Sequence, residues 1–340
     1  MRDVEVYPKL TLDLTKLQQN MAAVVDLCRP YGISVFGVTK VCCGWPEVGR
    51  ALLAGGAVGL ADSRMANLVR LGEAGLGPLM LLRSPAPQQA AQVVETADIS
   101  LNSEKAVLQA LNSAAEERGI VHRVLLMVDL GEMREGVWDG ELLGLYSFAQ
   151  ALPHIEVWGV GANFSCLNGS PPWQGQLEQL AQLARSCGAP NLVVSGGNSS
   201  ALHLIRRGLW QGEWTAAVNN LRIGESVFLG WDLIDKTPLP GCHQEVCRLE
   251  AEVIEVQDKQ VGGKWVRRAV VALGKQDIGT GTVWPLCPGT AVVGVTSDHL
   301  VLDVSQAPDT RVGDVAAFGV DYWALLGLFT SPYVRKEELR

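Results

Sequence analysis

The stretch ISVFGVTKVCCGWPEVGRALLAGGAVGLA, residues 33–61, combines two apolar strands with a helix between them. Apolar and β-branched residues fill 33–41 and 58–61, and helical spacing of apolar residues runs from Pro46 to Ala54. Parallel neighbours in a sheet need a crossover of this kind, usually a helix. The stretch therefore predicts a βαβ unit of a parallel sheet.

The same pattern recurs along the chain as far as about residue 230. Apolar runs predict strands at residues 33–41, 58–61, 79–82, 99–101, 123–130, 156–162, 192–195 and 221–224. Helical spacing predicts helices at residues 46–54, 65–74, 104–118, 142–152, 176–186 and 200–207. A series of eight strand–helix units favours an α/β fold with a closed (βα)8 TIM barrel over an open sheet.

After residue 230 the pattern changes to strands separated by Gly- and Asp-containing turns. Pro238 and Pro240 mark the break, and RLEAEVIEV and TAVVGVTSDHLVLDV are typical of a mainly antiparallel β domain. The opening run YPKLTLDL could pair with that domain. We therefore expect an N-terminal strand at 1–10 that joins the β domain, a barrel at 11–235 and a C-terminal β domain at 236–340.

Composition excludes several functional classes. The 340 residues carry a net charge of -8, so no basic field is available for nucleic acid or an anionic membrane. The start of the chain lacks the apolar run of a signal peptide, and no later run is long enough to cross a bilayer. Eight scattered cysteines without a CxxC pair favour a reduced, cytoplasmic compartment. A small molecule and a second copy of the chain are the expected partners.

Lys40 stands at the end of the first predicted strand, where a (βα)8 barrel places its chemistry. Apolar neighbours would desolvate its amine and disfavour the charged form, which suits an amine that attaches covalently to a cofactor. The alternative is a structural lysine whose charged end reaches out of the barrel mouth.

Two loops with phosphate-binding character follow the last two predicted strands. SGGNSS spans 195–200 and RIGES spans 222–226. Glycine N–H groups, serine hydroxyls and a helix N-terminus are donors that hold a phosphate. SGGNSS alone could be a turn with a helix cap, but barrels often bind phosphate at both of these places. A lysine opposite such loops indicates pyridoxal phosphate.

Other polar residues follow the strands, and some of them must complete hydrogen bonds of the barrel rim. They are Asp62, Arg83, Asn102, Asp129, Asn163 and Arg222. Arg222, in the last strand, could face the ring nitrogen of the cofactor. Arg134, in LGEMREG after the fifth strand, could reach the ring hydroxyl.

The motifs GVTKVCCG, VDLGEMREG, SGGNSS and LRIGESVFLG resemble those of the alanine racemase family, whose members are pyridoxal-phosphate-dependent amino-acid racemases. LGKQDIG, VTSDHLVLDV and DYWALLGLFTSPYV resemble segments of the family's β domain, in the same order. The likeness spans nearly the whole chain and is greatest to the ornithine racemase branch. It implies an enzyme that interconverts L- and D-amino acids by two-base proton transfer at Cα.

The resemblance also implies residue roles. Lys40 would hold the cofactor and act as the base on one face of Cα. Arg222 would donate to the ring nitrogen; because arginine keeps its proton, return of a proton to Cα is favoured. The further cofactor contacts would be Arg134, Asn163, Ser195, Gly197, Asn198, Ser199, Gly224, Glu225 (through its backbone) and Tyr322.

Three positions depart from the family pattern. Lys275 stands where the family has a tyrosine, supplied by the partner subunit, as the second base. Gly44 replaces a tyrosine four residues after the lysine, and Ser297 replaces a methionine. A polar or basic substrate such as ornithine would suit these changes, in a homodimer with shared sites. The expected substrate contacts are Arg134, Asp277, Ser297 and Asp298.

Several alternatives remain open at this stage. Cys42, Cys43 and Cys166 are weaker candidates for the second base, because burial as inert apolar residues is the commoner role. A decarboxylase of this fold would need a Cys-Glu-Ser segment that the sequence lacks.

An aldolase of this fold would need a metal. Asp298, His299 and Asp303 could bind one, but we expect these residues to belong to an acidic edge strand, and no metal is predicted. A non-catalytic pyridoxal-phosphate regulator would lack a second domain.

Overall fold

The computed structural model describes residues 6–167 and 169–339, so residues 1–5 of the predicted N-terminal strand and residue 340 lie outside the described residues. The described chain forms two compact units. The barrel unit comprises 17–40 and 44–242; the β unit comprises the chain up to Lys16, 41–43 and the chain from His243 onward. Within the described ranges, no helix has the length and apolar character needed to span a membrane.

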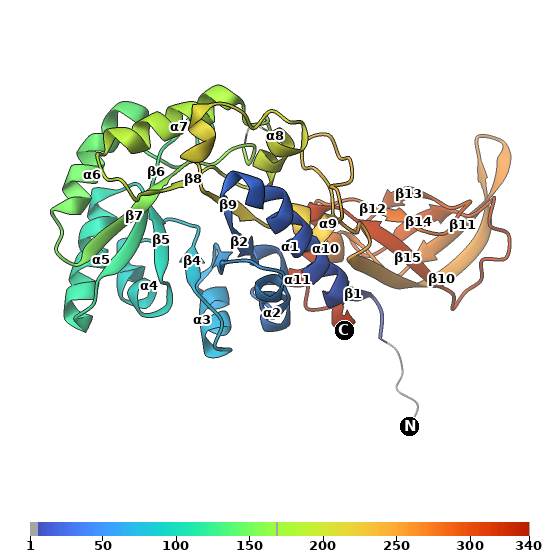
Figure 1. Ribbon diagram of the computed structural model, residues 1–340. Helices are drawn as coiled ribbons and strands as arrows, with labels where there is room; N and C mark the ends of the chain where they lie inside the picture. The colour runs from blue at the N-terminus through green and yellow to red at the C-terminus, as the bar shows by residue number, and fades with distance from the viewer. Residues whose placement is uncertain (1–5, 168, 340) are drawn as a thin grey trace. The chain divides into compact units, whose positions relative to one another are not determined.

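The barrel unit contains a closed barrel of eight parallel strands (Figure 1). Every strand overlaps one of the predicted runs, so the predicted barrel is confirmed. In barrel order the strands are β2 (Ser34–Val38), β3 (Gly59–Asp62), β4 (Leu79–Leu81), β5 (Ile99–Asn102), β6 (His122–Met127), β7 (Ile155–Gly161), β8 (Val193–Ser195) and β9 (Asn220–Ile223).

Helices surround these strands in Figure 1 and include all six that the sequence predicts. The helices α1, α4 and α9 are additional; the seven residues of α4 and the five of α9 are too few for a clear helical period. The helices are α1 (Leu14–Cys28), α2 (Pro46–Ala54), α3 (Met65–Glu73), α4 (Ala90–Thr96), α5 (Lys105–Arg118), α6 (Leu142–Gln150), α7 (Gln174–Ser186), α8 (Leu202–Arg206) and α9 (Glu225–Leu229).

Apolar side chains fill the interior of the barrel. Phe36 and Val38 of β2, Met80 of β4 and Met127 of β6 belong to one buried cluster there. A barrel packed in this way is a core and not a pore. Polar chemistry is therefore confined to the loops at the ends of the strands.

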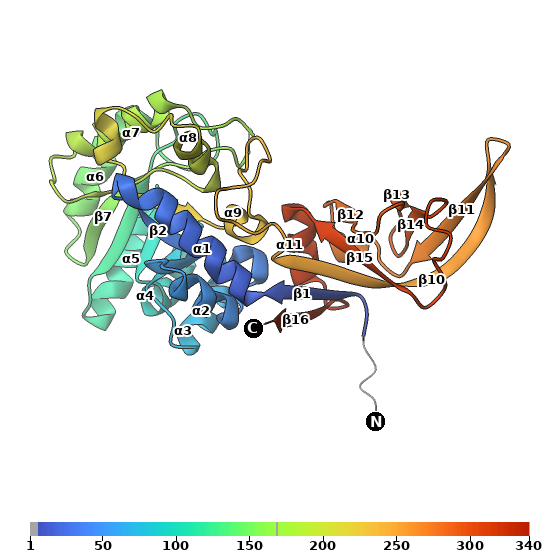
Figure 2. The same ribbon diagram turned by 45° about the vertical axis from the view of Figure 1, so that its right-hand side comes forward.

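The β unit is built on a mainly antiparallel sheet in the order β12-β15-β10-β11-β14-β13. β1 (Lys9–Asp13) pairs antiparallel with β10 and parallel with β16 (Arg335–Leu339), as Figure 2 shows. The other elements are β10 (Cys247–Val261), β11 (Lys264–Val271), α10 (Lys275–Ile278), β12 (Val283–Pro285), β13 (Ala291–Val295), β14 (Leu300–Asp303), β15 (Val315–Val320) and α11 (Tyr322–Thr330). The predicted antiparallel character of this part is confirmed.

Candidate active site

Lys40 lies two residues beyond β2, at the start of a 3₁₀ turn that covers Lys40–Cys42. Its side chain is exposed. The expectation of a lysine desolvated by an apolar strand is therefore wrong for this chain, because the strand ends at Val38 and the turn places Lys40 outside the barrel core. The position at the carboxyl end of a strand agrees with a site at the barrel mouth.

A buried hydrogen-bond network anchors the backbone that carries Lys40. Thr39 donates its N–H to the carbonyl of Ala61 (2.9 Å) and its hydroxyl to Asp62 Oδ2 (2.7 Å). Asp62 Oδ1 accepts from Asn67 Nδ2 and from the N–H of Arg64, both at 3.0 Å. Burial raises the pKa of Asp62, while the hydrogen bonds from Thr39 and Asn67 act in the opposite direction. The network ties Lys40 to β3.

Gly44 closes the turn after Lys40 and has no room for a side chain. Its φ is +64°, and a Cβ there would lie 2.7 Å from Cβ of Asn67. Its N–H donates to the carbonyl of Thr39 (3.2 Å). The backbone itself therefore excludes a tyrosine at this position, so the departure from the family pattern is part of how this loop is built.

The loops after β8 and β9 meet at Ser199. Ser199 Oγ accepts from the N–H groups of Gly224 (3.3 Å) and Ser226 (3.4 Å), at the start of α9. Asn198 Oδ1 caps the neighbouring turn through the N–H of Ser200 (2.9 Å). Within the described residues, the buried hydroxyls of Ser200 and Ser226 have no hydrogen-bond partner. Buried hydroxyls next to N–H donors have the unused capacity that a phosphate needs.

Arg222 is buried at the end of the barrel, with 4% of its surface exposed. Its guanidinium donates to the carbonyl of Ala162 (2.7 Å) and to Ser195 Oγ, and Ser195 in turn donates to Asn220 Oδ1 (2.6 Å). Burial lowers the pKa of Arg222 to about 10, although the nearby charge of Glu135 acts to raise it. Arg222 is therefore protonated at neutral pH. A guanidinium has five N–H donors, so this anchoring leaves capacity for a further acceptor.

Asp129 organises the loop that carries Arg134. Its Oδ1 accepts the N–H groups of Gly131, Glu132 and Met133, at 2.8 to 3.1 Å, and its Oδ2 accepts that of Arg134 at 3.0 Å. Arg134 pairs with Glu135 at 2.7 Å. The loop is thus fastened to the end of β6.

Asn163 links the loops after β7 and β8. Its Oδ1 accepts from Asn198 Nδ2 (3.2 Å), and its Nδ2 donates to Cys166 Sγ (3.1 Å). Asn198 Nδ2 also donates to the carbonyl of Phe164 (2.8 Å). Gly197 belongs to the same place, since a Cβ there would lie 2.9 Å from the Phe164 ring. The structure therefore brings the predicted residues of these two loops together.

The β unit brings Lys275 to the same exposed edge as Ser297 and Asp298. The N–H of Lys275 donates to the carbonyl of Thr296 (2.9 Å), and Gln276 Nε2 donates to Asp298 Oδ1 (2.5 Å). Ser297 Oγ donates to Asp298 Oδ2 (2.8 Å). This edge of the β unit is polar and carries both signs of charge.

Asp277 has a structural role in the β unit. It is buried, and its Oδ2 accepts the N–H of Gly274 (2.9 Å), which caps α10. Its Oδ1 accepts from Ser331 Oγ (3.4 Å). Both oxygens thus have partners inside the chain, and the substrate contact of Asp277 stays a prediction. Tyr322 opens α11, which Asp321 caps through the N–H of Ala324 (2.7 Å).

Asp303 is held by partners within the β unit. Asp303 pairs with Arg268 at 2.7 Å and accepts the N–H of Ser305. Among the residues that the structure describes, the one group of three possible metal ligands is a different one, His203, Asp232 and Asp235.

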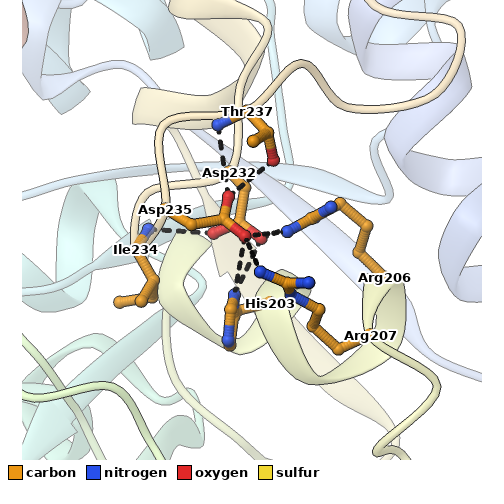
Figure 3. A network of polar contacts seen from close by, with 7 residues as sticks. All are labelled: His203, Arg206, Arg207, Asp232, Ile234, Asp235 and Thr237. Carbon is orange, nitrogen blue, oxygen red and sulfur yellow. Dashed lines mark hydrogen bonds and ion pairs between the residues drawn. The ribbon is translucent and has the colours of Figure 1, made fainter.

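Figure 3 shows that arginines already occupy that second group. Arg206 Nε lies 2.8 Å from Asp232 Oδ2, His203 Nδ1 lies 2.9 Å from the same oxygen, and Arg207 Nη2 lies 2.6 Å from Asp235 Oδ2. Two guanidinium groups neutralise the two carboxylates, so the cluster is an ion-pair network. It joins α8, which follows the Ser199 loop, to the segment after α9.

We expect this network to make stability depend on pH. A hydrogen bond from the Thr237 side chain lowers the pKa of Asp235 to about 2, together with a hydrogen bond from the Thr237 backbone and the charges of Arg206 and Arg207. A carboxylate with a lowered folded-state pKa stabilises the fold above its unfolded-state pKa of about 4, and this contribution is lost as the pH falls toward 2. Melting temperatures across this range should therefore fall less steeply in Asp235→Asn than in the wild type. The exposed Asp309→Asn is the control, and parallel curves for all three proteins would contradict the expectation.

Comparison with known proteins places the chain in a family. Residues 12–230 match the sequence model of the alanine racemase N-terminal domain. The ornithine racemase of Acetoanaerobium sticklandii is 35% identical over 98% of this chain and 100% of its own length. The lysine racemase of Thermotoga maritima is 34% identical over 97% of this chain and 98% of its own length. The chain belongs to the alanine racemase family.

This family member is an amino-acid racemase, as the sequence predicts. The crystal structure of alanine racemase from Corynebacterium glutamicum shares the fold, with a TM-score of 0.77 and 20% identity over 98% of this chain and 100% of that chain. Both near-full-length relatives are racemases, so the decarboxylase, aldolase and regulator alternatives are not favoured.

Sequence reasoning missed several residues that shape the site of this racemase. Asp62 and Asp129 were noted only as polar residues at strand ends, and the structure shows that each holds a loop of the mouth. Ser226 and the buried Glu132 lie within the quoted segments RIGES and LGEMREG, but neither residue was singled out. The one indication in the sequence is that an acidic or hydroxyl residue stands within a few positions of a strand end. Many residues with a purely structural role stand at such positions too.

Proposed function

We propose that this racemase binds pyridoxal phosphate at the mouth of its barrel and interconverts the enantiomers of a basic amino acid such as ornithine or lysine. The observation that carries the proposal is the meeting of Ser199, Gly224 and Ser226 at the same barrel end as Lys40, where two buried hydroxyls have no hydrogen-bond partner among the described residues. The names of the two near-full-length relatives support the substrate class.

The residues of the mouth fit the cofactor. Ser199, Ser200 and Ser226, with the N–H of Gly224, would hold the phosphate. Lys40 would hold the cofactor covalently, and its exposure leaves the amine accessible. When bound, the cofactor withdraws electrons from the substrate Cα and so acidifies its C–H bond. Further contacts are proposed for Asn163, Ser195, Gly197, Asn198, Glu225 and Tyr322.

The proton transfers would be carried out by the chain's own side chains. Lys40 would remove or return the Cα proton on one face, and Lys275 would act on the other. Arg222 is fixed by Ala162 and Ser195 and keeps its proton, so it donates a hydrogen bond without giving the proton away. That favours return of a proton to Cα. Arg134 would contact cofactor and substrate from its anchored loop.

Lys275 is proposed to act in the site of a partner subunit, in a homodimer, because the family resemblance places a partner residue there. Ser297 and Asp298 lie at the same exposed edge and would contact the substrate. Within the described residues no disulfide joins any of the eight cysteines, which supports the proposal of a cytoplasmic enzyme.

Chiral analysis tests the substrate class directly. The purified protein, with added pyridoxal phosphate, is incubated with L-ornithine, L-lysine and L-alanine, and the D-enantiomers are measured. We expect kcat/KM for ornithine or lysine to exceed that for alanine by at least about 100-fold, because a site built to hydrogen-bond a substrate group rejects a substrate without it by about 10⁴- to 10⁵-fold. Preferred racemisation of alanine would overturn the proposal of a basic substrate.

A further inference from the structure

Glu132 is a buried carboxylate with one oxygen unused. Only 3% of its surface is exposed. Its Oε1 accepts the N–H of Leu167, whereas its Oε2 is buried and has no hydrogen-bond partner within the described residues. Buried carboxylates are normally paired with a cation or fully hydrogen-bonded. The unused oxygen therefore indicates a ligand that brings donors and positive charge.

Glu132 lies at the mouth of the barrel. Its loop leaves the carboxyl end of β6, and Leu167 belongs to the segment that leaves the carboxyl end of β7. Asp129 accepts the N–H of Glu132 at 2.8 Å and that of Arg134 at 3.0 Å, so both residues sit on one anchored loop. Cys166, next to Leu167, contacts Asn163 at 3.1 Å. The carboxylate is thus held among the proposed cofactor residues.

The cations near this place have other partners. Arg134 pairs with Glu135 at 2.7 Å, and the Arg222 guanidinium donates to Ser195 and Ala162. Across residues 6–167 and 169–339, Glu132 forms no ion pair. Among the described residues, the carboxyl group of Glu132 at the mouth therefore has one oxygen without a cationic or neutral donor.

We propose that Glu132 binds the distal ammonium of the substrate's basic side chain. This inference rests on the proposed function and names the residue that selects the side chain. A primary ammonium has one positive charge and three donors. It can pair with Oε2 while Oε1 keeps the N–H of Leu167. An uncharged side chain of the same length leaves the oxygen unpaired, so it binds less well.

The variant Glu132→Gln isolates the charge. Glutamine has the same shape and keeps an acceptor for the N–H of Leu167. We expect kcat/KM for ornithine to fall by about 100-fold, as for the loss of one partner of a buried charge pair. The rate with norvaline, which has the same carbon chain without the amine, should change by less than about threefold. If the wild type prefers lysine, norleucine takes the place of norvaline.

Binding without turnover gives a second measurement. The compound 5-aminopentanoate keeps the distal ammonium but lacks the α-amine. Calorimetry on the cofactor-loaded protein should show that Glu132→Gln weakens its binding by at least about tenfold, while pentanoate binding stays the same. The exposed Glu141→Gln is the matched control and should behave as wild type in both experiments.

The outcomes separate this inference from the proposed function. Equal use of ornithine and norvaline by the wild type sinks the proposed substrate class. If the wild type prefers ornithine and Glu132→Gln keeps that preference, Glu132 does not bind the distal ammonium. An equal loss of kcat/KM for ornithine and for norvaline in Glu132→Gln would contradict the role of Glu132 in the same way. If Glu132→Gln does not fold, Glu132→Asp serves instead. This variant withdraws the carboxylate by one methylene, which the longer side chain of lysine can follow. The ratio of kcat/KM for lysine to kcat/KM for ornithine should therefore rise, and an unchanged ratio contradicts the proposal.

Discussion

The substitution Lys40→Ala is expected to lower kcat/KM for racemisation by at least about 10³-fold, the scale expected when a general base and a covalent attachment point are both lost. The side chain is exposed, and the contacts that hold its backbone are made by Thr39, Asp62 and Gly44. Alanine keeps those contacts, so the fold should persist. The measurement is exchange of the Cα hydrogen in D₂O for each enantiomer, with chiral analysis of the product.

A second exposed lysine provides the control for Lys40. Lys259 lies in β10 and pairs with Glu255 at the surface, so Lys259→Ala should keep both the rate and the melting temperature. Cα exchange at the wild-type rate in Lys40→Ala, with every amino acid that the wild type accepts, would falsify the assignment.

The substitution Lys275→Ala is expected to lower the rate of inversion by about 10²- to 10³-fold in both directions, because inversion needs one proton donor or acceptor on each face of Cα. Lys40 remains in this variant. It should still exchange the Cα hydrogen of the one enantiomer that it faces, without inverting it. Exchange in D₂O followed by chiral separation reveals this asymmetry. Inversion at the wild-type rate would show that another group is the second base.

Mixed subunits test whether the site is shared in a homodimer. Lys40→Ala and Lys275→Ala subunits, when co-expressed, would form heterodimers with one complete site and one site that lacks both lysines. About a quarter of the wild-type rate should then return, since half of randomly paired dimers are mixed and each has one of two sites. A site built within one subunit gives no recovery.

The barrel follows from the sequence because apolar periodicity is a local property. Each predicted strand was observed, but the end of the first was misjudged: the apolar run continues to Val41, whereas β2 ends at Val38. Val41 and Cys42 are buried in the β unit instead of extending the strand. Apolarity predicts burial and does not say against which part of the chain a residue is buried.

The candidate site was predictable only where a residue type and a strand end coincide, as at Lys40, Ser199 and Arg222. Asp277 shows the limit. The family resemblance suggested a substrate contact but not the observed hydrogen bond, in which the carboxylate on the four-residue helix α10 accepts the N–H of Gly274. The direction of a side chain depends on the turn that carries it, and spacing along the chain does not include that information.

The sequence by itself determined the order of strands and helices, the lysine at the barrel mouth and the two loops that approach each other after the last strands. Only the tertiary structure decided which polar atoms are buried and which of them lack a partner. Ser199 meets Gly224 across 25 positions of the chain, and Glu132 meets Leu167 across 35. Burial and hydrogen bonding at these places depend on residues far apart in sequence, so the unused oxygen of Glu132 is visible only in the folded chain.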